Sequence, residues 1–246
     1  MLLIGRMFDR ETGFVVFRKN GFDILIDYRG GDECGTRTCI ATDMYSRYLP
    51  LFALPERIRA LDLGANGGGF PLMLRIHGIQ VNRVVSVEMN PLTFVRLHVN
   101  LATNLGTSAV AINAAVCGSD RGSEILMKPS RGSTSNSIFA DQADATEAHI
   151  GVPTTTIKDL YTKFFDNELV DICKIDIEGA EYEACDESAD EALKKIRYLL
   201  IEFHDRSKTP AFIEHITALG FREMAPEMER KTGENTEVRA YRGPEA

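Results

Sequence analysis

The sequence predicts an α/β fold in which helices cover both faces of a mostly parallel sheet. Short apolar runs such as IRALDLG and RVVSVEM alternate with segments whose apolar residues recur at helical spacing. This alternation is typical of parallel sheets, because each crossover between parallel strands needs a long connection, usually a helix. The chain has 246 residues, of which 44% are hydrophobic and 26% charged, and this suits one sizeable core.

An N-terminal extension precedes the alternating pattern. The runs GFVVFRK and FDILIDY flank Asn20-Gly21, a dipeptide that favours a tight hairpin turn. The segment ATDMYSRYLPLF is expected to form a helix that stops near Pro55. We therefore divide the chain into an extension over residues 1–50 and a main domain over residues 51–246.

The main domain is expected to contain seven strands. They lie over residues 58–64, 83–89, 109–116, 169–177, 197–204, 221–226 and 236–242, with a further edge strand over 123–128. Helices are expected over residues 70–77, 90–105, 155–165, 181–196 and 209–219, with Asn90-Pro91 and Gly220 as end signals. A long polar segment, residues 128–153, interrupts the rhythm, and we expect either a disordered loop or a lid there.

Charge, hydropathy and cysteine content argue against several classes of protein. The net charge is −8, which argues against tight binding to a nucleic-acid backbone. No run of 18 apolar residues is present, so we expect no membrane span, and the start of the chain is too polar for a secretory signal. The five cysteines are scattered without a CxxC pair, so we expect a cytoplasmic protein with reduced thiols rather than a zinc site.

The segment LDLGANGGGF, residues 61–70, follows the first strand of the main domain. It lacks the second glycine of a G-x-G-x-x-G dinucleotide fingerprint, where Asn66 stands, and it lacks the lysine of a P-loop. A glycine turn of this kind lets the backbone approach a ligand. The carboxylate of Asp62 would repel a pyrophosphate but would suit a cation, and the sulfonium and ammonium groups of S-adenosylmethionine meet that demand.

Glu88 ends the second predicted strand of the main domain. An acidic residue at this place in an α/β nucleotide site accepts hydrogen bonds from ribose hydroxyls. A solvated residue at a strand end is the alternative. The combination of glycine loop, strand and acid favours the ribose role.

Charged side chains follow two later strands. In CKIDIEGAEYE, Lys174, Asp176 and Glu178 alternate, so they share one face of a strand; in LIEFHD, Glu202 and His204 do the same. The carboxyl ends of neighbouring parallel strands meet at one sheet edge, so both groups are expected to lie together where ligands bind. A buried salt bridge is the alternative for Lys174, and a helix-capping histidine is the alternative for His204.

Four segments resemble the signature blocks of the FkbM-type methyltransferases and occur in the same order: LDLGANGGGF, VVSVEMNPLTFVRLHVN, CKIDIEGAE and LLIEFH. They extend from Ala60 to His204, and the last two are far more specific than the glycine loop. The resemblance implies a Rossmann-like class I methyltransferase fold with a seven-stranded sheet and S-adenosylmethionine as donor. It also implies O-methylation of a hydroxyl, often on a sugar, a glycan or a secondary metabolite.

The resemblance also implies roles for individual residues. The methionine end of the donor would lie along the glycine loop, the ribose on Glu88, the adenine beside Ala114 and Ala115, and the methyl group beside Asp176 to Glu178. The implied cofactor-binding residues are Asp62, Gly64, Ala65, Asn66, Gly68, Phe70, Glu88, Met89, Asn113, Ala114, Ala115 and Asp176. The implied catalytic residues are His204, Asp176, Glu178, Glu202 and Lys174.

An alcohol is a poor nucleophile and needs a base, or a metal that lowers its pKa. His204 is the best base candidate, because an unperturbed histidine has a pKa of about 6.5. Asp176, Glu202 and His204 are alternatively candidates to hold Mg²⁺ or Mn²⁺. We favour the scheme without metal.

Two other functions remain open. One is an N-methyltransferase acting on protein or nucleic acid, but the place where such enzymes often carry N/D-P-P-Y/F reads DIEG here. The other is a non-catalytic module that keeps the cofactor pocket, which the acidic clusters disfavour. The acceptor is expected to be a small molecule or a glycan, with nucleic acid disfavoured. The sequence leaves the oligomeric state open.

Overall fold

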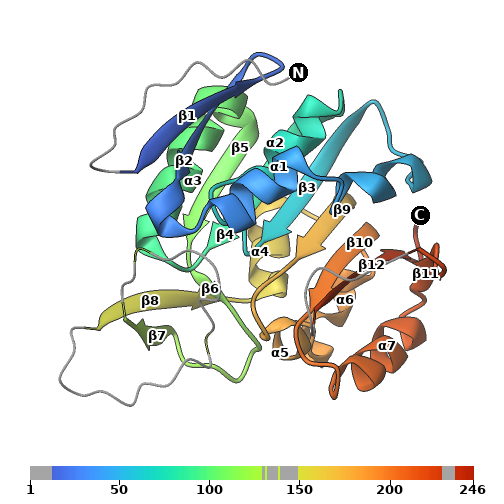
Figure 1. Ribbon diagram of the computed structural model, residues 1–246. Coiled ribbons are helices and arrows are strands. Elements are labelled where there is room, and N and C mark those ends of the chain that lie inside the picture. Colours follow the sequence, from blue (N-terminus) through green and yellow to red (C-terminus); the bar gives the residue numbers. More distant parts are fainter. Residues whose placement is uncertain (1–12, 129–130, 132–137, 139–148, 229–235) are drawn as a thin grey trace.

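A seven-stranded sheet forms the centre of the computed structural model, which describes residues 13–128, 131, 138, 149–228 and 236–246 (Figure 1). The strands of this sheet are β3 (Arg57–Leu63), β4 (Gln80–Glu88), β5 (Ala109–Asn113), β9 (Val170–Ile175), β10 (Ile196–Phe203), β11 (Arg222–Met224) and β12 (Glu237–Arg242). Their order is β11-β12-β10-β9-β3-β4-β5. The five strands from β10 to β5 run parallel, and β12 and β11 add an antiparallel edge. The predicted fold class is confirmed.

The strand order reverses between β3 and β9. From β3 the chain proceeds outward to β4 and β5, and it then crosses back to β9 and β10 on the other side. Such a switch point leaves a crevice at the carboxyl ends of the two central strands, because the connections leave in opposite directions. The glycine loop follows β3, and Asp176 follows β9.

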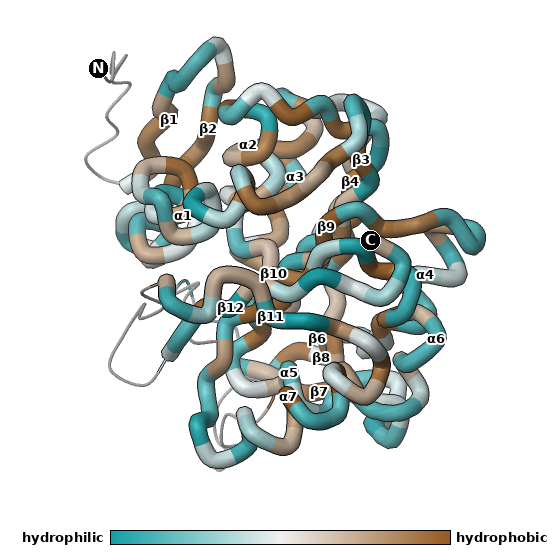
Figure 2. Tube along the Cα trace, turned by 90° about the vertical axis from the view of Figure 1, so that its right-hand side faces the viewer, coloured by the Kyte–Doolittle hydropathy of each residue, from teal (hydrophilic) through white to brown (hydrophobic). Residues whose placement is uncertain are grey.

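Helices cover both faces of the sheet (Figure 1). The helices are α1 (Thr38–Ala41), α2 (Gly69–Ile76), α3 (Pro91–Leu105), α4 (Ile157–Phe164), α5 (Glu181–Ala184), α6 (Asp190–Leu193) and α7 (Thr209–Ala218). Residues of α1 to α3 pack on one face, and residues of α4 to α7 pack on the other. In Figure 2 the hydrophobic colouring is concentrated on the strands, and hydrophilic colouring prevails on the outer turns.

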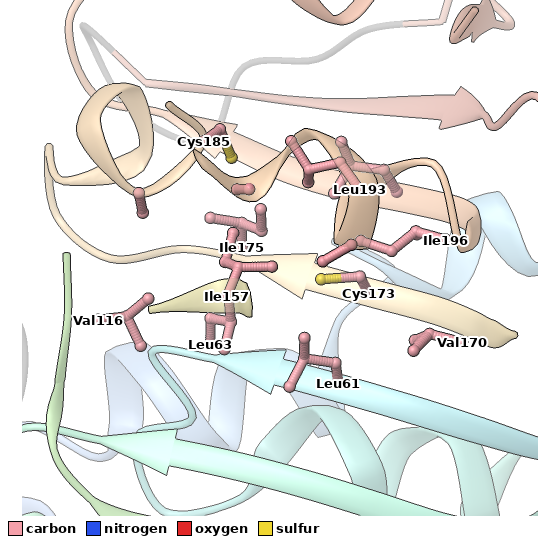
Figure 3. Close-up of a cluster of buried hydrophobic side chains, with 14 of the residues drawn as sticks. Leu61, Leu63, Val116, Ile157, Val170, Cys173, Ile175, Cys185, Leu193 and Ile196 are labelled. Atoms are coloured by element: carbon pink, nitrogen blue, oxygen red, sulfur yellow. The ribbon is translucent and has the colours of Figure 1, made fainter. Parts of the chain in front are cut away.

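The core on the α4 to α7 face shows why the central strands hold the site in place. Leu61 and Leu63 of β3 and Cys173 and Ile175 of β9 alternate toward this face, where they belong to the same buried cluster as Leu193 of α6 (Figure 3). All five side chains are at most 1% exposed. Fully burying such side chains stabilises the fold by about 1.5–3 kcal/mol each. The strand ends beside the crevice are therefore rigidly placed.

The predicted N-terminal hairpin is confirmed. It consists of β1 (Phe14–Lys19) and β2 (Phe22–Asp27) with a two-residue turn at Asn20 and Gly21, both at positive φ. The hairpin docks beside α3, where the side-chain amides of Asn100 and Asn104 bond the backbone of β2. The extension is thus anchored to the main domain by partly buried hydrogen bonds.

The helix predicted over residues 41–52 is wrong. A π-helical turn over Glu33–Arg37 leads into α1, which ends at Ala41, and a 3₁₀ helix follows over Ser46–Leu51. Thr42 is extended (φ −110°, ψ 178°), and its hydroxyl bonds the Thr38 carbonyl. Side-chain bonds of this kind compete with helix hydrogen bonds and end the helix early.

A second sheet of three strands lies beyond the main sheet in the order β6-β8-β7. Its strands are β6 (Ala115–Val116), β7 (Glu124–Met127) and β8 (Ile150–Thr155). The predicted strand over 109–116 is therefore two strands, and the segment 123–128 pairs with β8 instead of edging the main sheet. β8 lies in a stretch that was expected to be a loop up to Pro153. Residues 129–148 of the proposed lid, apart from Arg131 and Ile138, lie outside the described residues.

The single helix predicted over residues 181–196 is also wrong. It is divided into α5, a 3₁₀ helix over Glu187–Ala189, and α6. Asp186 causes the break, because its carboxylate accepts hydrogen bonds from the backbone N–H and the hydroxyl of Ser188.

Two further observations concern membrane spans and cysteines. Within the described part of the chain, none of the helices has the length and apolar character that a membrane span requires. The five cysteines form no disulfide, and four of them are buried.

Candidate active site

A cleft of about 220 Å³ lies at the carboxyl ends of β3, β4, β9 and β10. The predicted residues that line it are Gly64, Asn66, Glu88, Met89, Ala114, Asp176, Glu178, Glu202 and His204. The lining residues that the sequence analysis did not single out are Cys34, Gly35, Thr38, Met44, Val87, Val116, Ile138 and Ile177. A smaller adjoining pocket of about 50 Å³ includes Ala65, Phe70 and Lys174 in its wall. The cleft therefore joins both predicted clusters and also the N-terminal extension.

The glycine loop turns sharply at the end of β3. Gly64, Asn66 and Gly68 all have positive φ (74°, 49° and 89°), a conformation that residues other than glycine rarely adopt. Gly68 is the residue before α2, and a Cβ atom on it would press on Leu97 at 3.1 Å. The loop is thus shaped for close approach of a ligand to its backbone.

Thr36 of the extension fixes the middle of this loop. Its hydroxyl donates to Asn66 Oδ1 and accepts the N–H of Gly67, each at 2.8 Å, and its side chain is fully buried. These bonds explain how Asn66 is held in a left-handed conformation. Sequence reasoning missed Thr36, because a contact between residues 30 positions apart leaves no local pattern.

Glu88 is 6% exposed and lies between the glycine loop and α3. Its two carboxylate oxygens accept the backbone N–H groups of Asn66 at 2.9 Å and Asn90 at 2.8 Å. Burial raises the pKa of Glu88 to about 7, although these two bonds and Lys174 favour the ionised form. A carboxylate oxygen has two lone pairs, so each still has room to accept one hydroxyl.

Six of the predicted cofactor-binding residues are absent from the lining of the main cleft: Asp62, Ala65, Gly68, Phe70, Asn113 and Ala115. The Asn113 amide donates to the carbonyls of Glu88 and Met89, so it braces the end of β4. Ala115 is 1% exposed and packs in the core of the second sheet, beside Met89. Phe70 is buried edge-to-face against Tyr45, with ring centroids 5.9 Å apart.

Lys174 lies beneath the cleft in a network of charges. Its Nζ is 3.4 Å from both Asp62 Oδ1 and Asp176 Oδ2, and it donates to the carbonyls of Gly64 at 2.5 Å and Leu63 at 3.3 Å. Burial opposes its charge, but Asp176 and Asp62 raise the pKa of Lys174 above its usual value. The lysine is therefore a permanent cation that ties β3 to β9.

Asp62 lies at the inner end of this network and is fully buried. It accepts the hydroxyl of Ser86 at 3.3 Å in addition to its pair with Lys174. Burial raises the pKa of Asp62, and Lys174 opposes that rise. Asp62 thus lies below the glycine loop, where it contacts Lys174 and Ser86, and it does not line the cleft.

Tyr45 joins the two acidic strand ends. Its hydroxyl lies 3.0 Å from Asp176 Oδ2 and 3.2 Å from Glu202 Oε2, and the side chain is 2% exposed. Sequence reasoning missed it, because the expected helix over residues 41–52 gave no reason to place Tyr45 at the sheet edge. The only sequence signal for this role was the presence of two tyrosines in the short segment DMYSRYLP.

Both predictions of a shared strand face need correction, because β10 ends at Phe203, before His204, and β9 also ends early. β9 ends at Ile175, so Asp176, Ile177 and Glu178 form a turn beyond it instead of continuing the strand. Glu178 has a φ of +54° and is followed by Gly179 at +99°. A side-chain-bearing residue held in this region is strained, and such strain is common at functional sites.

His204 contacts carboxylates through both ring nitrogens. Nδ1 is 2.6 Å from Glu181 Oε1, and Nε2 is 3.6 Å from Glu178 Oε2 and 3.7 Å from Asp176 Oδ1. Burial lowers the pKa of His204, but the bond to Glu181 and the three carboxylates raise it to about 9. The value of about 6.5 used in the sequence argument therefore does not apply.

Asp176, Glu178 and His204 also form a group that is able to hold a metal ion. Each offers one ligand atom, and these atoms lie within 4.8 Å of one another. Glu202, one of the predicted metal candidates, is outside this group, and Tyr45 contacts its carboxylate instead.

This arrangement combines a glycine loop, a buried acid on the following strand, and a histidine among acids at the switch point of the sheet. The sequence matches the family described as Methyltransferase FkbM domain over residues 62–225. The chain belongs to this family. This membership confirms the resemblance drawn from the four sequence segments.

Comparison with solved structures supports the fold. An FkbM methyltransferase from Methylobacillus flagellatus KT has a TM-score of 0.58 at 17% identity, and the alignment covers 81% of this chain and 47% of that chain. The present chain thus corresponds to less than half of that relative's length. TrmK from M. capricolum, solved with S-adenosyl-homocysteine, has a TM-score of 0.48 at 9% identity, covering 83% and 70% of the two chains. No curated protein matches the sequence.

Proposed function

We propose that this FkbM-family protein is an S-adenosylmethionine-dependent O-methyltransferase whose acceptor is a hydroxyl of a sugar, a glycan or a secondary metabolite. The observation that carries the proposal is the single cleft lined by Glu88, Asp176 and His204 at the switch point of the sheet. A donor with a ribose and a cationic sulfonium fits a cleft whose acids outnumber its cations.

The donor would bind along the glycine loop. Glu88 would accept the two ribose hydroxyls with the lone pairs that Asn66 and Asn90 leave free. The adenine would lie beside Ala114 and Val116, which are apolar residues in the lining of the cleft. Gly64 and Asn66 expose backbone to the methionine end.

The reaction would be an in-line displacement at the methyl carbon. The acceptor oxygen forms a bond to this carbon as the bond from carbon to sulfur breaks, and the sulfur keeps the electron pair as S-adenosylhomocysteine forms. Nε2 of neutral His204 takes the acceptor's proton, while the Nδ1–H group stays hydrogen-bonded to the carboxylate of Glu181. Asp176 and Glu178 then stabilise the resulting histidinium, since they lie 3.7 Å and 3.6 Å from Nε2.

A divalent metal is the alternative means of activating the acceptor. Asp176, Glu178 and His204 would hold Mg²⁺ or Mn²⁺, which would lower the pKa of the bound hydroxyl. Binding would require neutral His204, so it would release a proton from the histidinium. We favour His204 as base, because its Nδ1 is already oriented by Glu181.

The test uses the purified protein with S-adenosylmethionine carrying a ¹³C methyl group. The acceptor panel contains neutral polyols, glycans, aromatic alcohols, peptides and RNA. Product NMR distinguishes an oxygen-bound from a nitrogen-bound methyl group, and release of S-adenosylhomocysteine gives the rate. An O-methyl product supports the proposal, and an N-methyl product would establish the alternative. Binding of the donor without turnover on any acceptor would favour a non-catalytic module.

A further inference from the structure

We propose that Tyr45, which belongs to the N-terminal extension, is a positioning residue that holds Asp176 and Glu202 at the methyl-transfer point. This inference rests on the proposed function, since it assigns a task to a side chain of the same site. It would make the extension a part of the catalytic machinery.

The first support is the contact itself. One phenol O–H lies within hydrogen-bond distance of two carboxylate oxygens from two different strand ends, Asp176 after β9 and Glu202 in β10. Two neighbouring carboxylates repel each other, so a shared donor between them stabilises the pair.

The second support is that the ring is held rigidly. Tyr45 packs edge-to-face on Phe70 of the α2 start, and Lys174 Nζ lies 5.9 Å from its ring centroid. A buried ring with two such neighbours cannot swing away, so the hydroxyl is a fixed point. The side chain is 2% exposed, and water does not replace it readily.

The third support is the set of competitors for the same carboxylate. Asp176 Oδ2 is also 3.4 Å from Lys174 Nζ, and Oδ1 is 3.7 Å from His204 Nε2. Without the phenol, these two cations alone would determine how the carboxylate turns. The hydroxyl therefore fixes Oδ2 together with Lys174, and it leaves Oδ1 turned toward His204.

The chain supplies a matched control three residues away. Tyr48 is also 2% exposed, but its hydroxyl donates to the backbone carbonyl of Val238 at 2.9 Å. Tyr45→Phe and Tyr48→Phe each remove one buried hydroxyl and keep the ring. A merely structural hydroxyl would give the same result in both variants.

The experiment measures the affinities of S-adenosylmethionine and S-adenosylhomocysteine by calorimetry for the wild type and both variants. The two probes differ by one methyl group and one positive charge, so their affinity ratio reports on carboxylates near the transfer point. Tyr45→Phe is expected to lower the affinity for S-adenosylmethionine by about three- to tenfold, as for the loss of one hydrogen bond. It is expected to lower the affinity for S-adenosylhomocysteine by less than about twofold. Tyr48→Phe is expected to leave the ratio unchanged.

A double-mutant cycle with Glu202→Gln completes the test. If Tyr45 acts through these acids, Glu202→Gln changes the ratio less in the Tyr45→Phe background than in the wild type. A Tyr45→Phe ratio equal to that of the wild type, or additive effects in the cycle, would overturn the inference while leaving donor binding intact. A wild type that binds neither probe would overturn the proposed function and this inference together.

Discussion

The α-carbon of Gly64 lies directly against the backbone of Asp176: a Cβ atom built on Gly64 would stand 1.6 Å from the Asp176 carbonyl oxygen. The N–H of Asp176 in turn donates to the carbonyl of Leu63 at 3.1 Å. The glycine loop after β3 and the acidic turn after β9 are therefore one unit at the switch point. Whatever moves one of them moves the other.

Gly64→Ala is therefore expected to abolish binding of S-adenosylhomocysteine and to destabilise the fold. The clash involves two backbones, so no side-chain rotation relieves it, and overpacking of this kind costs about 1–3 kcal/mol. Gly78→Ala is the matched control, because Gly78 also has a positive φ (86°) but open space around it. Denaturant unfolding and calorimetry measure both effects. Equal losses in the two variants would mean that only backbone strain matters at Gly64.

Much of the site was predictable because it depends on strand order. Asp176 and His204 follow neighbouring strands, and the carboxyl ends of parallel strands must meet at one edge. The contributions of Thr36 and Tyr45 were not predictable in this way. Both lie in a segment without a regular period, and their partners are determined by how the extension docks.

Thr36→Val is expected to weaken S-adenosylhomocysteine binding by about tenfold, because the glycine loop loses the hydroxyl that bridges Asn66 and Gly67. Valine keeps the shape of the side chain, so the effect isolates the hydroxyl. Thr42→Val removes an exposed hydroxyl that donates to the Thr38 carbonyl and accepts the N–H of Met44 in the same segment, and it is expected to weaken binding by less than about twofold, because this hydroxyl does not contact the glycine loop. If both variants bind like the wild type, the loop does not depend on the extension.

Glu88 is expected to make donor binding depend on pH. Its pKa of about 7 lies above the ordinary value of 4.5, so the native state binds this proton more tightly than the unfolded chain. The resulting stability cost is absent below about pH 4.5 and is complete above about pH 7, where the carboxylate is ionised and ready for the ribose. Affinity for S-adenosylhomocysteine should therefore rise from about pH 6 to about pH 8, by about tenfold.

Glu88→Gln should bind weakly and without this rise, whereas Glu88→Ala should lose about 1.5–3 kcal/mol of binding free energy. Asp171→Asn is the control, because Asp171 is a buried acid at the opposite end of β9. Calorimetry across the pH range provides the measurement. A rise that persists in Glu88→Gln would remove the ribose assignment.

The sequence argument assumed an ordinary pKa for His204, and this error has a physical origin. The sequence displays a histidine at a strand end, but the raised pKa depends mainly on Glu181, which follows a turn that no pattern places beneath the ring. Position at a sheet edge is encoded in the order of the elements. The charge state of a side chain depends on neighbours that the fold brings in from several directions.

The pKa of His204 gives its contribution to stability a definite sign. The value is raised from 6.5 to about 9, so the protonated form is favoured by folding. The stabilisation is complete below about pH 6.5 and is lost as the pH rises through about 9. Comparing the unfolding free energies of the wild type and His204→Gln across this window measures it. A constant difference would mean that the pairs with Glu181, Glu178 and Asp176 do not raise the pKa.

The last prediction separates base catalysis from metal catalysis. If neutral His204 takes the acceptor's proton, the methyl-transfer rate should rise with pH toward about 9, because deprotonation limits it below that value. His204→Ala should then lower the rate by about 10²–10⁴-fold and remove this rise, and a chelator should have little effect. His215→Gln, which changes a half-buried histidine that lies 3.0 Å from Asp190 and is absent from the cleft lining, should keep the wild-type profile.

If a metal activates the hydroxyl instead, a chelator should abolish turnover and added Mg²⁺ or Mn²⁺ should restore it. Asp176→Asn should then weaken metal binding as well as turnover, because Asp176 belongs to the group with Glu178 and His204. We favour the base, since Glu181 already fixes the tautomer that leaves Nε2 as acceptor once the ring is neutral. Turnover that survives both chelator and His204→Ala would contradict both schemes and leave positioning of donor and acceptor as the source of the rate.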